Sequence, residues 1–249
     1  MPKQILPLVS ICTPTRDRLE FLPLLMQCIQ KQTYPHTCLE WVVLDNGNES
    51  AESVCRQFPS LRYERLDPAN GQVALGRMRN MTHELARGEI LINLDDDDFY
   101  PARRVAHAVE TLLSRPDCLV AGAALTPTYF PDRDEIWVFG PYCANHAIAN
   151  SFAFWRDLLK ETSYEDDARF AEEKHFLKNY TTPLANLDCR QTVLTMAHSR
   201  NTFDKRKLLV NPALNRARKV DWTLPQIIPD EGLRRSYLAA IAGTANNLS

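Results

Sequence analysis

Four consecutive aspartates, Asp95 to Asp98, are the residues of this sequence whose type and spacing point most directly to chemistry. They follow the apolar run Ile90 to Ile92 and precede the aromatic pair Phe99-Tyr100, where a solvated run of charge is not expected. Adjacent carboxylates repel one another, and a cation relieves that repulsion. Because Mg²⁺ and Mn²⁺ take oxygen ligands from one or two carboxylates and leave positions for substrate phosphates, the run predicts a metal-diphosphate site.

Two further polar clusters follow apolar runs. Residues 13–18 (Thr-Pro-Thr-Arg-Asp-Arg) come after the run 8–12, and residues 45–48 (Asp-Asn-Gly-Asn) come after the run 39–44. Taken singly, each cluster is also typical of a turn or a helix cap. If the runs are parallel strands, however, all three clusters emerge at one edge of the sheet, where open α/β sheets bind their ligands.

The elements that would position these clusters alternate between strand and helix patterns. The strand patterns cover 8–12, 39–44, 61–66 and 89–94, and the helix patterns cover 19–32, 51–57, 73–86 and 101–114. Continuous apolar strands separated by helices predict a parallel sheet that is buried on both faces. From Thr126 onward, prolines and aromatics predict a second lobe that is not built from βαβ units. In that part we expect a helix over 167–178 and a strand over 192–197, and only weak periodicity past Asn211.

Composition narrows the class of protein. The 249 residues include 29 Lys and Arg against 31 Asp and Glu, a formal net charge of -2, so no polyanionic partner such as nucleic acid is indicated. The apolar runs are far shorter than the ~20 residues that span a bilayer, and residues 1–16 do not read as a signal peptide. We therefore expect a cytoplasmic protein. Seven cysteines without metal-ligand spacing indicate reduced, buried thiols.

The sequence resembles the family-2 glycosyltransferases with the GT-A nucleotide-sugar fold. The similarity lies in residues 9–16, 42–47, 77–80 and 86–90 and in the Asp-x-Asp pattern of 94–98, which occur in the order and approximate spacing of that family. It implies a single α/β domain with a Rossmann-like, mostly parallel central sheet flanked by helices and a smaller acceptor-side lobe. Residues 1–125 would form the nucleotide-sugar half and residues 126–249 the acceptor half.

The resemblance also implies a donor site. Asp45 would accept a hydrogen bond from the nucleotide base, since a carboxylate only accepts and uracil N3–H donates. Asp97 would hold the metal, and Asp95 the ribose or the metal, with the division among 95, 96 and 97 left open. Arg77 fits an ordinary surface arginine equally well. The other residues expected to contact the donor or its metal are Thr13, Pro14, Thr15, Arg16, Arg79, Asp96, His198 and Arg200.

The same resemblance places the acid–base chemistry at Glu172-Glu173, although a charged helix face would also explain the pair. Neighbours on a helix lie about 100° apart, so the two carboxylates cannot do the same job. Glu173 is our candidate base for the acceptor hydroxyl, and Glu172 our candidate hydroxyl ligand, with the reverse assignment open.

The resemblance and these residues together imply an inverting glycosyltransferase that uses a nucleoside-diphosphate sugar, with UDP as the first choice of nucleotide. It would use Mn²⁺ or Mg²⁺ and a glycan or other hydroxyl acceptor. A sugar nucleotidyltransferase is the alternative enzyme, although residues 13–18 lack the glycines of a triphosphate-binding loop. An aspartyl-nucleophile hydrolase is weaker still, and a non-catalytic carbohydrate- or nucleotide-binding module is the alternative outside the enzymes. The sequence names neither the sugar nor the acceptor nor the oligomeric state.

Overall fold

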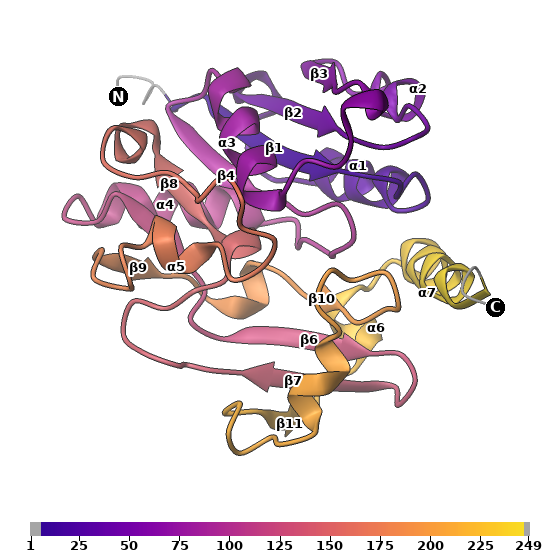
Figure 1. Cartoon of the computed structure of the whole chain (residues 1–249). Coiled ribbons are helices and arrows are strands. Elements are labelled where there is room, and N and C mark those ends of the chain that lie inside the picture. The colour runs from indigo at the N-terminus through magenta and orange to yellow at the C-terminus, as the bar shows by residue number, and fades with distance from the viewer. Residues whose placement is uncertain (1–5, 247–249) are drawn as a thin grey trace.

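A computed structural model of the chain describes residues 6–246. Residues 1–5, where no signal peptide was predicted, and residues 247–249 lie outside the described part. Two β-sheets lie one beyond the other, and most of the helices pack on the larger one (Figure 1). Within residues 6–246 no helix is long and apolar enough to cross a membrane.

The larger sheet has seven strands in the order β3-β2-β1-β4-β8-β5-β9. All neighbouring pairs are parallel except those of β8, which runs antiparallel to β4 and β5. The strands are β1 Val9–Thr15, β2 Leu39–Asp45, β3 Leu61–Arg65, β4 Ile90–Asn93, β5 Val120–Gly122, β8 Ala153–Trp155 and β9 Leu184–Asn186. The predicted α/β class with a mostly parallel sheet is therefore confirmed.

Both faces of this sheet are buried, as the continuous apolar runs predicted. Because side chains alternate along a strand, Ile11 and Ile92 join one hydrophobic cluster while Cys12 and Leu91 join another on the opposite face. The accompanying helices are α1 Leu22–Gln30, α2 Glu52–Cys55, α3 Leu75–Leu85 and α4 Arg104–Ser114. Helix α3 packs on β1 and β2, and α4 packs on β5 and β8.

The alternation of strands and helices ends near Thr126, as expected. There it forms a smaller sheet in the order β10-β6-β7-β11, from β6 Thr126–Phe130, β7 Glu135–Phe139, β10 Thr195–Met196 and β11 Arg218–Val220. Between these strands the chain returns to the larger sheet through β8 and β9. A boundary at residue 125 thus does not separate the two sheets, because the larger one takes strands from both halves of the sequence.

Two predicted elements differ from the structure. The expected helix over 167–178 is the single turn α5 Glu173–Phe176. Ala171 before it and Lys178 after it have positive φ, which a helix does not allow. The weakly periodic tail contains α6 Leu224–Ile227 and the 16-residue helix α7 Glu231–Asn246, which lies against α1.

Candidate active site

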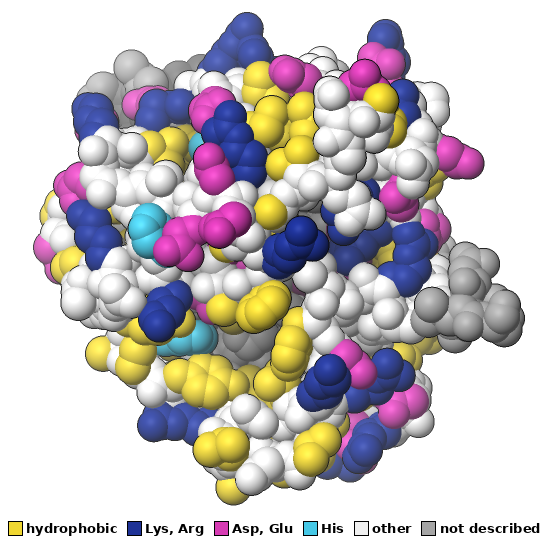
Figure 2. Space-filling model, viewed as in Figure 1, with side chains coloured by type: hydrophobic (Ala, Val, Ile, Leu, Met, Phe, Trp, Pro, Cys, Tyr) yellow, Lys and Arg dark blue, Asp and Glu magenta, His cyan; other side chains and the backbone are white. Residues whose placement is uncertain are grey.

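A cavity of about 410 Å³ opens at the carboxyl ends of β1 and β4 and extends to β6 and β7. Figure 2 shows a hollow near the middle of one face, with hydrophobic side chains along its lower rim and Lys or Arg side chains above it. The edge where the sequence predicted a ligand therefore carries a cavity. One wall belongs to the larger sheet and the other to the smaller sheet.

Most of the predicted site residues meet in this cavity. Those that line it are Pro14, Thr15, Arg16, Arg79, Asp95, Asp96, Asp97, Glu172 and Glu173. Those that do not line it are Thr13, Asp45, Arg77, His198 and Arg200.

Asp96 and Asp97 share a cation supplied by the chain itself. Nη1 of Arg18 donates to Asp96 Oδ1 at 2.8 Å and to Asp97 Oδ2 at 2.6 Å. The hydroxyl of Thr15 donates to the other Asp96 oxygen at 2.7 Å. Burial raises the pKa of Asp96 to about 6, with Arg18 opposing that shift. Burial also favours protonation of Asp97, but Arg18, His198 and Lys205 together outweigh it and hold the pKa of that carboxyl well below its usual range.

His198 orients Asp97 rather than facing the cavity. Its Nε2 lies 3.0 Å from Asp97 Oδ2, and its ring stacks on Phe21 with centroids 4.9 Å apart. The backbone N–H of Arg200 lies 3.3 Å from Nδ1, and Asn201 Nδ2 lies 2.9 Å from Nε2. Burial lowers the pKa of His198, which favours the neutral imidazole. Asn201 Nδ2 also donates to Asp97, at 3.2 Å.

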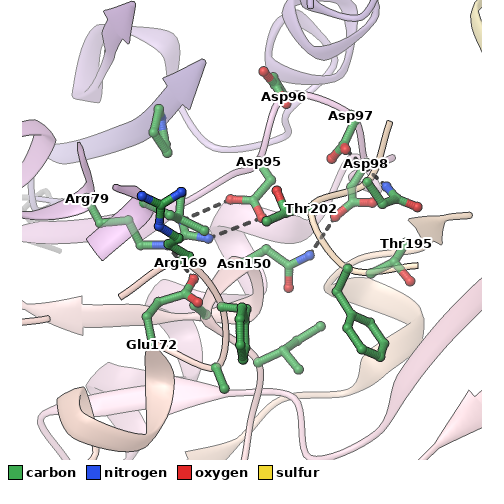
Figure 3. A pocket seen from close by; sticks show the side chains of 18 of the residues that line it. Arg79, Asp95, Asp96, Asp97, Asp98, Asn150, Arg169, Glu172, Thr195 and Thr202 are labelled. Atoms are coloured by element: carbon green, nitrogen blue, oxygen red, sulfur yellow. Dashed lines mark hydrogen bonds and ion pairs between the residues drawn. The ribbon is translucent and has the colours of Figure 1, made fainter. Parts of the chain in front are cut away.

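Arg79 joins the aspartate run to the glutamate pair. Its Nε donates to Glu172 Oε1 at 2.8 Å, and its Nη2 donates to Asp95 Oδ2 at 3.2 Å. Figure 3 shows Asp95 and Glu172 pointing at Arg79 from different elements, with Arg169 close by. Arg79 is buried on α3, so both carboxylates are held by a fully desolvated guanidinium. Glu172 is 6% exposed, and its Oε1 forms the contact with Arg79.

Glu173 is held differently from its neighbour. It is half-buried and lines the cavity, where burial and then the adjacent Glu172 raise its pKa to about 7 from an ordinary value near 4.5. A carboxylate that is protonated about half of the time near neutral pH is suited to accept a proton during a reaction. The two glutamates therefore have separate environments.

Asp98 closes the floor of the cavity. Its Oδ1 accepts from the backbone N–H of Met196 at 2.9 Å, and its Oδ2 accepts from Asn150 Nδ2 at 2.6 Å. Burial raises the pKa of Asp98 to about 7, against the attraction of Lys205. The amide oxygen of Asn150 is buried at the cavity wall with no protein partner among the described residues, so it can accept from a ligand hydroxyl.

Asp45 stabilises a turn at the end of β2. Its carboxylate accepts from the backbone N–H of Gly47 at 2.7 Å and of Ala51 at 2.9 Å, and from the hydroxyl of Tyr63 at 2.6 Å. The next residue, Asn46, reaches the cavity instead. Its amide bonds to the backbone of Gly71 and Val73 on one side only, which leaves a second donor hydrogen and a second acceptor lone pair.

The remaining predicted residues lie beside the cavity. Thr13 points into the core and accepts from Trp41 Nε1 at 3.0 Å. Arg77 lies on the exposed side of α3, 3.2 Å from Glu84, and Arg200 pairs with Glu20.

Several cavity residues were not singled out from the sequence. Arg18 lies within the polar cluster 13–18, but no pattern connects it with the aspartates that follow 78 and 79 residues later. Asn201 reaches Asp97 across 104 residues. These contacts arise only when the strands assemble, so the one usable signal in the sequence was the polar cluster 13–18. The other cavity residues that the sequence analysis did not single out include Asn46, Asn150, Arg169 and Lys205.

Comparison with known proteins gives the family. The family model described as "Glycosyl transferase family 2" matches residues 10–139, which is more than half of the chain. The chain belongs to this glycosyltransferase family. The matched segment runs from β1 to β7 and so includes the aspartate run and most of the nucleotide-side wall of the cavity.

Relatives agree with this membership. The chain is 31% identical over 123 residues to glycosyltransferase AglE of Haloferax volcanii, which covers 47% of this chain and 39% of AglE. The structure of S. aureus TarS residues 1–349 in complex with UDP-GlcNAc has a TM-score of 0.64 at 16% identity, over 78% of this chain and 60% of that one. A mannosyltransferase from Pyrobaculum calidifontis, in complex with GDP-Man and Mn²⁺, has a TM-score of 0.63 at 18% identity, over 98% of this chain and 76% of that one. The chain spans less than two thirds of each of AglE and TarS 1–349. The TarS and mannosyltransferase structures share its GT-A fold.

Proposed function

We propose that this family-2 glycosyltransferase moves a sugar from a nucleoside-diphosphate sugar to an acceptor hydroxyl, with inversion at the anomeric carbon. UDP is our first choice of nucleotide. One observation carries the proposal. Glu173, whose pKa is raised to about 7, lines the same cavity as the four aspartates. A base and a cation site therefore face the same space. A non-catalytic binding module has no need of such a base.

The nucleotide belongs at the carboxyl end of β1. Pro14, Thr15 and Arg16 line the cavity there, and Asn46 lies on the neighbouring strand end. We assign the base contact to Asn46 in place of Asp45, because Asp45 already accepts three hydrogen bonds within its turn. Asn46→Ala should weaken UDP binding by about 1–3 kcal/mol, the usual cost of an unmade buried hydrogen bond. Unchanged affinity in calorimetry would remove this assignment.

The residues present fit a hard divalent ion. Carboxylate oxygens of Asp96 and Asp97 already pair with one cation, the guanidinium of Arg18, at 2.8 and 2.6 Å. We therefore assign Asp97, with Asp96, to hold the ion, and His198 to orient Asp97. Among residues 6–246 no group of three or more His, Cys, Asp or Glu is arranged to hold an ion alone, so substrate phosphates and water would complete its coordination. When bound, the ion supplies positive charge that stabilises the departing diphosphate.

Glu173 then acts on the acceptor. Its carboxylate takes the proton of the acceptor hydroxyl as that oxygen bonds to the anomeric carbon, and the bond from that carbon to the diphosphate breaks on the opposite side. Such a displacement inverts the configuration at the anomeric carbon. Arg79 bonds to Asp95 and Glu172, and so it positions the residues next to the donor site and next to Glu173.

A thermal-shift panel of UDP-, GDP- and dTDP-sugars, each with Mn²⁺ and with EDTA, tests the donor. A ligand at 100 times its Kd stabilises the folded state by about 2.7 kcal/mol, whereas a compound that does not bind gives no shift. We expect a UDP-sugar with Mn²⁺ to give the largest shift and to be hydrolysed slowly without acceptor. Binding without transfer or hydrolysis across a broad acceptor panel would support the binding module instead, and product of retained configuration by NMR would remove the inverting mechanism.

A further inference from the structure

Arg18 occupies the place where the proposed function needs a metal. Its guanidinium bridges Asp96 and Asp97 through Nη1, while its Nη2 donates to the backbone carbonyl of Arg200 at 2.8 Å. The side chain of Arg18 is 17% exposed, and those of Asp96 and Asp97 are 3% and 6% exposed. The contact is therefore a nearly dry ion pair inside the cavity, formed by a residue that also lines it.

We propose that Arg18 is a resident cation of the free protein, which a divalent ion must displace from Asp96 and Asp97, and that the released guanidinium then pairs with the donor diphosphate. This inference rests on the proposed function, because it concerns the order in which that site is filled. It assigns Arg18 a second position that the free protein does not use.

Crowding at Asp97 argues for displacement rather than sharing. Its Oδ2 already receives Arg18 at 2.6 Å, His198 at 3.0 Å and Asn201 at 3.2 Å. A metal ion that binds this oxygen therefore needs one of its three neighbours to leave. A guanidinium and a divalent ion would also repel each other at that range, whichever Asp97 oxygen the ion used. His198 and Asn201 carry no positive charge in this arrangement, so Arg18 is the one that the metal expels.

The same charges explain why the free protein needs Arg18. Two adjacent buried carboxylates repel each other, and a buried charge without a partner is strongly unfavourable. Arg18 pairs with both, through Nη1 at 2.8 Å and 2.6 Å. Arg18 thus offsets part of the negative charge of the two carboxylates before a metal binds.

Arg18 has a place to go. It lies two residues beyond Arg16 in the loop after β1, and Arg16 and Thr15 also line the cavity where we place the nucleotide. A guanidinium offers a planar fork of donors that suits phosphate oxygens. Because release of Arg18 and arrival of the diphosphate are favourable together, metal and nucleotide should each increase the affinity for the other.

The test measures Mn²⁺ binding by the purified protein, by electron paramagnetic resonance of free Mn²⁺, with and without UDP. Arg18→Gln removes the resident cation while keeping a polar side chain. We expect it to bind Mn²⁺ at least tenfold more tightly than wild type in the absence of UDP, and UDP to increase its Mn²⁺ affinity by a smaller factor than in wild type. Arg56→Gln is the control: it removes the same charge at a side chain that is 70% exposed, pairs with Glu52 on α2 and does not line the cavity, and it should bind Mn²⁺ alone as wild type does.

Suppose that the wild type binds Mn²⁺ and UDP, and that Arg18→Gln binds Mn²⁺ no more tightly than the wild type. This result would overturn the displacement of Arg18 and leave the proposed function standing. If neither protein binds Mn²⁺ even with saturating UDP, the metal dependence of the proposed function fails and this inference fails with it. Arg18→Lys guards against misfolding of the first variant, because a single ammonium cannot bridge both carboxylates and still contact Arg200. It should bind Mn²⁺ with an affinity between those of wild type and Arg18→Gln, and a wild-type affinity would count against the proposal.

Discussion

The glutamate pair shows how adjacent residues of one type acquire different work. Glu172 is the residue before α5, buried at 6% exposure with its carboxylate on Arg79. Glu173 begins the helical turn and lines the cavity. The assignment of Glu173 as base and Glu172 as a hydroxyl ligand stays a prediction. The ion pair with Arg79 gives Glu172 a positioning task in addition.

Glu173→Gln tests the base directly. The amide keeps the size and hydrogen bonding of the side chain but cannot accept a proton, so kcat should fall by about 10²–10⁴-fold while donor binding persists. Glu172→Gln is the matched neighbour: it weakens the pair with Arg79, so it should lower the thermal midpoint and reduce kcat less. Steady-state kinetics with calorimetry of donor binding separates the two. The reverse pattern would exchange the roles.

The pH profile gives a second test of Glu173. Its carboxylate accepts a proton only when ionised, and its pKa is raised to about 7 by burial and Glu172. We expect kcat to fall about tenfold per pH unit below about 7 and to level off above it. The effect on stability has the opposite sign: the folded protein favours protonated Glu173, so this contribution is complete below about 4.5 and is lost as the pH rises through about 7. An acid limb near pH 4.5, with the fold intact by circular dichroism, would assign the base elsewhere.

Residue types alone predicted the aspartate run because its chemistry is local: four carboxylates after a buried strand need a cation. They did not predict Arg18, and the contact of Asp45 with the nucleotide base came from the family resemblance. The choice between Asp45 and Asn46 depends on which side chain the turn uses for its own hydrogen bonds. Gly47 and Ala51 take the oxygens of Asp45, and no spacing rule shows that in advance.

At the scale of elements, the sequence predicted best where local and tertiary preferences agree. The apolar run 39–44 is β2 Leu39–Asp45, and the pattern 73–86 is α3 Leu75–Leu85. The prediction of a helix over 167–178 was wrong because tertiary contacts override the helix preference of its charged residues. The carbonyl of Ala168 accepts from the backbone N–H of Gly76 at 2.9 Å, which ties this loop to α3 and brings Glu172 to Arg79.

Arg79 connects three elements, and its removal should therefore affect the fold. Arg79→Met would leave Asp95 and Glu172 without their partner, and breaking a buried pair in this way costs about 3–5 kcal/mol. Arg77→Met is the control on the same helix: its side chain is 40% exposed, so stability should change by no more than about 0.5 kcal/mol. Urea unfolding measures both. Equal values would mean that the Arg79 cluster is no better than a surface ion pair.

At the scale of the molecule, the cavity depends on both sheets. Its aspartates follow β4 of the larger sheet, while Thr128 and Phe139 come from β6 and β7 of the smaller sheet. Both predicted halves, 1–125 and 126–249, contribute residues to this one cavity. Strands β8 and β9 return from the second half to the larger sheet, which holds the walls together.

This arrangement predicts how hydrogen exchange responds to ligands. UDP with Mn²⁺ should slow amide exchange at 15–18, 46–47 and 95–98, because bound nucleotide stabilises the conformation that holds it. A UDP-sugar should in addition slow exchange at 169–173 and 201–205, since these loops line the rest of the cavity, where the sugar and the acceptor would lie.

Helix α4 serves as the internal control for that measurement, because it packs on β5 and β8 and none of its residues lines the cavity. Its exchange should change no more than a general gain in stability requires. Suppose the UDP-sugar and UDP protect the same residues, all before 125. The loops at 169–173 and 201–205 would then take no part in donor binding, and the second wall would serve the acceptor alone. Protection of 169–173 by the sugar would instead place Glu173 next to the reacting carbon, as an inverting base requires.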